Sequence, residues 1–231
     1  MTKTWQLRPP APPTFFEAYP EIEPIILSLL YQRGLTTQQE IDKFLEPDFS
    51  AGQYDPFLFL EMAKTVKRIF QAIKKKEKIL IYGDYDVDGV CSAVLMSQTL
   101  QFLNSQPPAI YLPHRELEGY GLNLKAVEHI KKQKINLVIT VDCGANNILE
   151  LKKLAQAKIE AIILDHHSTT EQRPPVFSFI NPKFKKEKYP FKDLAAGGVV
   201  FKLTQALLAT AGSLAGGEAF IKWSLDIVAL A

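Results

Sequence analysis

The chain of 231 residues is 47% hydrophobic and 23% charged, which is the composition of an ordinary globular protein. It has no run of eighteen apolar residues and no apolar signal segment at its N-terminus, so we expect neither a membrane span nor export. Two cysteines without an export signal argue against a disulfide framework and favour a reducing cytoplasm, and a formal charge of +2 does not by itself indicate a nucleic-acid binder.

Residues 1–60 are predicted to form an N-terminal arm followed by short helices. Five prolines between residues 8 and 20 indicate an extended arm or linker. Residues 21–46 carry apolar side chains at helical spacing, with Gly34 as a helix stop. Thr36 or Thr37 is then the expected cap of a second helix that ends near Leu45.

From residue 61 onward, helical and strand patterns alternate. An amphipathic helix is expected over residues 61–76, and the strands that follow are short and almost purely apolar. This is typical of a parallel sheet covered on both faces, so we predict an α/β fold with a doubly wound, mainly parallel sheet for residues 61–231. The expected strands are 79–82, 109–112, 137–142 and 161–165, and the expected helices are 90–103, 122–132, 148–157, 194–210 and 218–231.

Three carboxylates, Asp84, Asp86 and Asp88, follow the first strand at alternate positions. In an extended backbone residues two apart point the same way, so these side chains should converge. Converged carboxylates repel one another unless a cation lies among them, and Mg²⁺ or Mn²⁺ takes such oxygen ligands. An Asp-rich turn is the plain alternative, and an EF-hand loop is disfavoured because Leu95 stands where that loop needs a glutamate. The pattern favours a metal-dependent enzyme.

Two further strands also end in residues that bind metals. Asp142 follows the third strand, and Asp165, His166 and His167 follow the fourth. Ligands of open α/β sheets bind outside the carboxyl ends of the strands, so these groups should meet the first three acids in one crevice. Taken alone, Asp142 is compatible with a loop cap, and Asp165 with a helix cap that accepts backbone N–H groups.

Basic residues near the strand ends are candidates for substrate binding. His114 and Arg115 follow the second strand, and arginine suits bidentate contact with phosphate. Lys183 opens the segment 183–192, which interleaves lysines with aromatic rings, as in surfaces that follow a phosphate backbone while rings stack on bases. An ordinary solvated loop is the alternative in both places.

The sequence resembles the DHH phosphoesterase superfamily. Residues 84–89, 141–144 and 165–167 are similar to its first three motifs, and residues 118–122 and 194–203 are similar to the bacterial RecJ family of single-strand-specific exonucleases. The resemblance implies hydrolysis of single-stranded DNA in the 5′-to-3′ direction with release of 5′-mononucleotides, in DNA repair and recombination. It also implies two Mn²⁺ or Mg²⁺ ions, and a single-strand-binding protein and a helicase as partners.

The same resemblance implies roles for individual residues. Asp165 would orient the histidines, and His167 would hold the scissile phosphate or stabilise its developing charge. Mixed carboxylate and imidazole ligation favours Mn²⁺ over Mg²⁺. The implied metal ligands are Asp86, Asp88, Asp142 and His166, with Asp84 as a ligand or as a neighbour that accepts a hydrogen bond.

Members of this family continue past a segment similar to residues 225–231 into a fourth motif with another metal-ligating aspartate. A second catalytic domain and a nucleic-acid-binding domain follow. We therefore expect either the N-terminal piece of a longer protein or a short relative whose constellation is incomplete. The alternatives are a DHH enzyme that hydrolyses oligoribonucleotides or small nucleotides, and a non-catalytic scaffold in a replication complex. The complete acids and histidines of the first three motifs favour an active parent.

Overall fold

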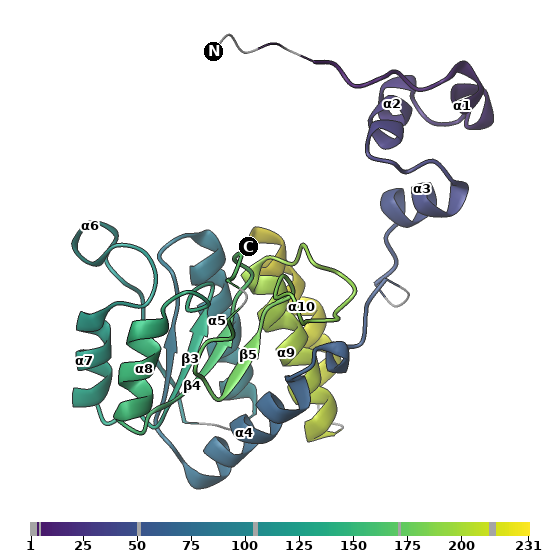
Figure 1. Ribbon diagram of the computed structural model, residues 1–231. Coiled ribbons are helices and arrows are strands. Elements are labelled where there is room, and N and C mark those ends of the chain that lie inside the picture. The colour runs from purple at the N-terminus through teal and green to yellow at the C-terminus, as the bar shows by residue number, and fades with distance from the viewer. Residues whose placement is uncertain (1–3, 5, 50–51, 104–105, 171, 213–215) are drawn as a thin grey trace. The chain divides into compact units, whose positions relative to one another are not determined.

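The computed structural model describes residues 4, 6–49, 52–103, 106–170, 172–212 and 216–231 (Figure 1). The chain divides into two compact units, Met1–Gln53 and Tyr54–Ala231, which are taken one at a time below. Among the described residues, no helix is long and apolar enough to cross a membrane.

The first unit contains three short helices, α1 (Pro13–Ala18), α2 (Pro24–Gln32) and α3 (Gln38–Leu45). Both helices expected within residues 21–46 are present, and Thr37 and Glu40 cap α3 through reciprocal side-chain to backbone bonds. The helices enclose a small apolar core made of Ala11, Phe15, Tyr19, Leu27, Leu30 and Ile41.

The extended arm predicted for residues 8–20 is wrong in part, because α1 lies within it. Pro13 occupies the first turn of this helix, where its missing N–H would have had no partner. Phe15 and Tyr19 then turn toward the core with their rings 5.2 Å apart. A proline-rich segment therefore does not exclude a helix that begins at one of its prolines.

The second unit is built around a five-stranded parallel sheet in the order β2-β1-β3-β4-β5. All residues of β1 and β3 are buried, since helices cover both faces, and this is why they appear in the sequence as apolar runs. The predicted doubly wound α/β fold is confirmed. The strands are β1 (Ile79–Tyr82), β2 (Ala109–Tyr111), β3 (Leu137–Val141), β4 (Glu160–Leu164) and β5 (Ser178–Ile180).

Four of the five strands agree with the predicted strands to within one residue at each end, whereas β5 was not predicted. It has only three residues, too few for a periodic pattern, and it begins shortly after Pro174 and Pro175. Side chains from α4 anchor this strand: the hydroxyl of Thr65 bonds that of Ser178, and Lys64 donates to the carbonyl of Phe177.

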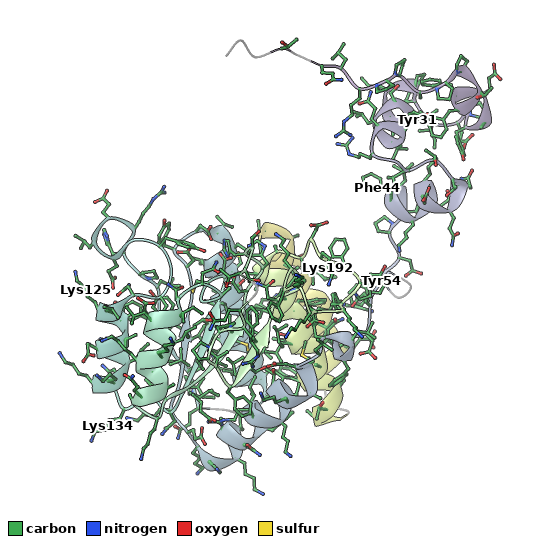
Figure 2. The ribbon with its side chains drawn as sticks, in the orientation of Figure 1. Tyr31, Phe44, Tyr54, Lys125, Lys134 and Lys192 are labelled. Atoms are coloured by element: carbon green, nitrogen blue, oxygen red, sulfur yellow. The ribbon has the colours of Figure 1, made fainter. Side chains whose placement is uncertain are left out.

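The two faces of the sheet carry different helices (Figure 1). Ile81 of β1 points into the core that contains α4, α5 and α9, while its neighbours Leu80 and Tyr82 point into the core beneath α7 and α8. Figure 2 shows Lys125 and Lys134 pointing outward from α7 and the turn after it, as expected for the polar side of an amphipathic helix. The helical segments are η1 (Pro56–Leu58), α4 (Met62–Lys75), α5 (Val87–Phe102), α6 (Arg115–Glu118), α7 (Leu124–Lys132), α8 (Ile148–Gln156), α9 (Ala196–Ala211) and α10 (Gly217–Leu230).

Candidate metal centre

The chain reverses its direction of winding between β1 and β3, which are neighbours in the sheet. From β1 it crosses to β2 on one side, and from β3 it proceeds through β4 to β5 on the other. The loops that follow β1 and β3 therefore run in opposite directions, and a crevice opens between them at the carboxyl ends of these two strands. The segments that follow β1, β3 and β4 carry the predicted acids and histidines to this edge.

Asp84 and Asp86 lie directly after β1 and are held by backbone N–H groups. Asp84 is 3% exposed and accepts a 2.8 Å bond from the N–H of Tyr85. Asp86 caps α5, and its Oδ1 accepts from the N–H of Gly89 at 3.0 Å. One carboxylate oxygen each from Asp84, Asp86 and Asp142 lie within 4.8 Å of one another, which makes a set of three oxygen donors.

Asp88 lies differently from the other two acids, because α5 already begins at Val87 and the alternation of an extended strand ends there. Its carboxylate spans to the first turn of α9, where Oδ2 accepts from the N–H of Ala196 at 2.9 Å and Oδ1 from the N–H of Gly197 at 2.8 Å. Oδ2 is also 3.5 Å from Nε2 of His166. The expected convergence at alternate positions therefore applies to the first two acids, and Asp88 reaches the centre through His166.

Asp142 connects the two parts of the centre. It is 1% exposed and has φ 60°, a left-handed conformation that aspartate adopts more readily than most residues. Its Oδ1 is 3.2 Å from Nε2 of His166 and 3.9 Å from Nδ1 of His167. Asp142, His166 and His167 form a second set of donors within 4.8 Å, so Asp142 belongs to both sets.

Asp165 lies beneath the two histidines and is 1% exposed. Its Oδ1 accepts from the backbone N–H of His166 and His167 at 2.7 and 3.1 Å and from Nδ1 of His167 at 2.8 Å, and its Oδ2 accepts from the N–H of Ala145. Burial acts to raise the pKa of Asp165, but these hydrogen bonds outweigh it and hold the pKa below its usual range. The carboxylate is therefore an acceptor only, so Nδ1 of His167 carries the proton and Nε2 is left for a ligand.

The electrostatics of the centre fit a divalent cation. Burial raises the pKa of Asp142 to about 6; the nearby imidazole of His166, with Nε2 3.2 Å from Oδ1, opposes this, and the charges of Asp88 and Asp86 add to it. Burial also raises the pKa of Asp84. Carboxylates whose ionised form is disfavoured by burial and by like charges gain most from a nearby cation. The oxygen and imidazole donors suit Mn²⁺, and Mg²⁺ through the oxygens alone.

The three predicted substrate-binding residues lie farther out. The guanidinium of Arg115 lies over the ring of Tyr85, 5.4 Å from its centroid. Tyr85 is the residue between Asp84 and Asp86 in the sequence. His114 precedes α6 and is exposed, and the exposed Lys183 bonds Asn181 through its backbone N–H. In the part of the chain that the structure describes, no side-chain contact joins His114 or Lys183 to the two donor sets.

Sequence reasoning gave no role at the site to two residues that lie at or beside the centre, although one of them, Tyr120, falls in the segment 118–122 that resembles the family. The ring of Tyr120 packs at 73° to that of His167 with the centroids 5.6 Å apart, and Asn147 bonds the backbone of Leu122, two residues after Tyr120. An aromatic residue between two glycines after a strand is the signal that could have indicated Tyr120. No sequence signal indicates Asn147, because its partner is 25 residues away.

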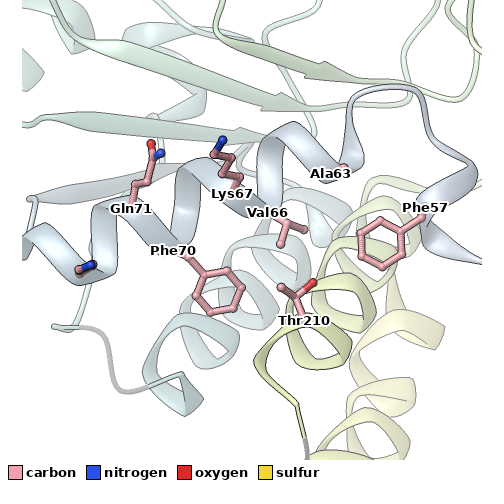
Figure 3. A pocket seen from close by; sticks show the side chains of 8 residues that line it. Phe57, Ala63, Val66, Lys67, Phe70, Gln71 and Thr210 are labelled. Carbon is pink, nitrogen blue, oxygen red and sulfur yellow. The ribbon is translucent and has the colours of Figure 1, made fainter.

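A separate pocket of about 570 Å³ opens between η1, α4 and α9 (Figure 3). It includes Thr210 in the last turn of α9, whereas the first turn of that helix contacts Asp88. With a rise of 1.5 Å per residue, the two ends are roughly 20 Å apart. The pocket is therefore distinct from the metal centre, and its lining is Phe57, Ala63, Val66, Lys67, Phe70, Gln71, Lys74 and Thr210.

Comparison with known proteins gives consistent similarities. The chain is 44% identical over 187 residues to the single-stranded-DNA-specific exonuclease RecJ of Bacillus subtilis, which covers 81% of this chain and 24% of that protein. The chain thus spans about a quarter of the length of this relative. A crystal structure of exonuclease RecJ bound to manganese matches with a TM-score of 0.62 and 25% identity, over 74% of this chain and 47% of that one.

A structure of RecJ from Thermus thermophilus in complex with Mn²⁺ matches with a TM-score of 0.67 and 22% identity, over 93% of this chain and 30% of that one, and shows the same fold. The N-terminal domain of the DHH family matches residues 78–231, which include both donor sets of the metal centre. The chain therefore belongs to the DHH family.

Proposed function

We propose that the protein is a metal-dependent phosphodiesterase that hydrolyses single-stranded DNA. The observation that carries the proposal is the pair of donor sets that share Asp142 at the switch point of the sheet. The similarity to a single-stranded-DNA-specific exonuclease supports the choice of substrate. The 5′-to-3′ direction, the release of 5′-mononucleotides, the role in repair and recombination and a cytoplasmic location rest on the resemblance of the motifs.

Two ions of Mn²⁺ or Mg²⁺ are the proposed cofactors. The residues that would hold them are Asp84, Asp86, Asp88, Asp142 and His166, with Asp142 common to both donor sets. When bound, the ions supply activation of a water molecule and stabilisation of the leaving oxygen. The chain's own acids contribute by lying preorganised, since backbone N–H groups and short loops already hold them in place.

His167 is the proposed contact to the scissile phosphate. Asp165 holds its Nδ1, so Nε2 is left free and, when protonated, donates to a phosphate oxygen. The hydrogen bond with Asp165 raises the pKa of His167, which favours the protonated form. Arg115 would bind phosphate beside Tyr85, and His114 and Lys183 would contact the strand farther from the centre.

The organisation proposed for the chain is an N-terminal arm with helices in residues 1–60 and a DHH phosphoesterase domain in residues 61–231. The fourth motif, the second catalytic domain and the nucleic-acid-binding domain of the family would lie beyond it. A single-strand-binding protein and a helicase are the proposed partners.

Calorimetric titration with Mn²⁺ tests the metal centre, on this chain, on Asp86→Ala and on Asp42→Ala. Asp42 is an exposed residue of α3, so its replacement controls for the loss of a carboxylate. We expect Asp86→Ala to lower the affinity for Mn²⁺ more than about tenfold, because loss of neighbours that only support a ligand already costs roughly 10–100-fold. Equal affinities for a folded Asp86→Ala and for the control would refute the site.

A digestion assay tests the substrate class. Single-stranded DNA with a 5′-phosphate is compared with the same strand in a duplex and with dinucleotides, each in Mn²⁺. The proposal expects 5′-mononucleotides from the single strand, with the duplex resistant. Preferential cleavage of dinucleotides would replace it with a small-nucleotide hydrolase of the same family. Mn²⁺ binding without cleavage of any of them, in this chain and in one extended through the fourth motif, would indicate a scaffold.

A further inference from the structure

The loop between α6 and α7 lies against the second donor set. It runs from Gly119 to Asn123, and its tip residue Tyr120 is 55% exposed. The ring of Tyr120 stands at 73° to the imidazole of His167 with the centroids 5.6 Å apart. This is the edge-to-face arrangement that aromatic rings prefer.

Side chains from elsewhere in the sequence hold the backbone of this loop. Asn147 makes two bonds to Leu122: its Nδ2 donates to the carbonyl at 3.0 Å, and its Oδ1 accepts from the N–H at 3.3 Å. The hydroxyl of Tyr82 donates to the carbonyl of Gly121 at 3.0 Å. A Cβ on Gly121, which has φ 75°, would lie 3.0 Å from Oδ1 of Asn147, so glycine permits this close approach.

The two anchors belong to the elements that also carry the acids. Tyr82 is the last residue of β1, fully buried and stacked on Tyr111, and Asp84 follows two residues later. Asn147 precedes α8 in the segment that begins with Asp142 after β3. The loop is therefore tied to the same two strand ends that position the metal ligands.

His167 needs a second restraint beyond its hydrogen bond to Asp165. That bond fixes the position of Nδ1, but a single bond leaves rotation of the ring about its direction open. The imidazole is partly exposed, with 36% of the side chain accessible, so surrounding packing restrains it only in part. The ring of Tyr120 supplies one such packing contact, in addition to the ring of His166, whose centroid is 4.7 Å from that of His167.

We propose that Asn147 and Tyr82 are positioning residues, which hold the loop 119–123 so that Tyr120 packs against His167 and keeps its Nε2 directed into the crevice. Tyr82 acts through Gly121 and Asn147 through Leu122, so either anchor controls the position of Tyr120. The inference deepens the proposed function and rests on it, because it concerns His167, which is the proposed phosphate contact. The coupling of the anchors to the ring of His167 requires neither metal nor DNA.

The test is imidazole NMR of the ¹⁵N-histidine-labelled, metal-free chain. The chain has four histidines, and a His167→Gln variant identifies the signal of interest. We expect Asn147→Ala and Tyr120→Ala to displace the His167 signals and to abolish the nuclear Overhauser contact between Tyr120 and His167. The signals of His129, which packs against Tyr111, should stay in place.

A double variant and conservative variants separate positioning from general loosening. If Asn147 acts through Tyr120, Asn147→Ala combined with Tyr120→Ala displaces His167 no further than Tyr120→Ala alone. Tyr120→Phe keeps the ring and should retain the wild-type signals, and Tyr82→Phe, which loses only the hydroxyl, should reproduce Asn147→Ala. As a matched control, Asn136→Ala removes a side-chain bond to the N–H of Lys78 before β1 and should leave His167 unchanged.

Two results would overturn the inference. One is a His167 spectrum of wild-type form in folded Asn147→Ala; the other is an additive displacement in the double variant. If Asn147→Ala fails to fold, Asn147→Asp decides, because it retains the acceptor for Leu122 N–H and loses the donor. A partial displacement then supports the proposal and a wild-type spectrum refutes it. Because metal and DNA are absent, a failure of Mn²⁺ binding or digestion leaves this result unaffected and remains a separate outcome.

Discussion

Lys202 offers a quantitative test of the packing of α9. This lysine is 6% exposed, and its Nζ donates to the carbonyl of Tyr54 at 2.9 Å. Burial lowers its pKa to about 8 from the ordinary value of 10.5, although the charge of Asp55 opposes the shift. At about 1.4 kcal/mol for each pH unit, this difference corresponds to about 3 kcal/mol. The folded state is destabilised by this amount wherever Lys202 is charged in both states.

The dependence on pH follows from the direction of this shift. Below about pH 8 both the folded and the unfolded chain carry the proton, and the penalty is fully present. Between about pH 8 and 10.5 the unfolded chain binds more protons than the folded chain, so the free energy of unfolding rises with pH. The contribution of Lys202 to this rise totals about 3 kcal/mol and is complete near pH 10.5.

Lys202→Met removes the charge and keeps a long aliphatic side chain. It also loses the hydrogen bond to Tyr54, which costs about 1 kcal/mol. We expect the variant to be about 2 kcal/mol more stable than the wild type at about pH 7, with the difference vanishing and then reversing toward pH 10.5. Urea unfolding followed by circular dichroism at several pH values between about 7 and 10 measures it.

The exposed Lys152 of α8 supplies the control, since Lys152→Met removes a lysine without changing a buried site. A stability difference between Lys202→Met and wild type that is the same at every pH would refute the reasoning. So would a variant that is less stable than the wild type at neutral pH.

Three further predictions concern the metal centre. Gly89→Ala should lower the free energy of unfolding by about 3 kcal/mol or more and weaken Mn²⁺ binding, because the added Cβ would lie 2.5 Å from the carbonyl oxygen of Asp84. Thermal melting measures the first effect and calorimetry the second. Asp165→Asn should destabilise the fold by about 2 kcal/mol in urea, because an amide cannot accept all the N–H groups that now converge on the carboxylate, and wild-type stability would contradict this. Arg115→Ala should weaken binding of single-stranded DNA with a 5′-phosphate in Mn²⁺, and unchanged binding in a folded variant would remove Arg115 from the proposed site.

The strands β1, β3 and β4 were predictable because burial on both faces requires uninterrupted apolar residues, and such runs can be recognised in the sequence. The sharing of a crevice by Asp142 with Asp84 and His166 was also predictable, because parallel strands place their carboxyl ends at one edge. The short strand β5 was not, since it has three residues and is held by pairing with β4 and by a side-chain bond from α4, 113 residues away in the sequence.

The surroundings of the site were less predictable than its ligands. The bonds of Asp88 to Ala196 and Gly197 and those of Asn147 to Leu122 join segments that are distant in sequence. Neither pair leaves a periodic or spacing pattern. Asp88 also shows where a local rule failed, since the helix that begins at Val87 ends the strand-like alternation.

The bonding of Asp88 and Asp165 has a consequence for the evolution of relatives of this chain. Both carboxylates accept backbone N–H groups that would otherwise be buried without a partner. Asp88 does so at the start of α9, and Asp165 does so in the segments that follow β3 and β4. Selection for folding alone would preserve both carboxylates. Asp86 gives up only one capping bond when replaced, so under the proposed function we expect a homologue without metal binding to lose Asp86 before either of the others.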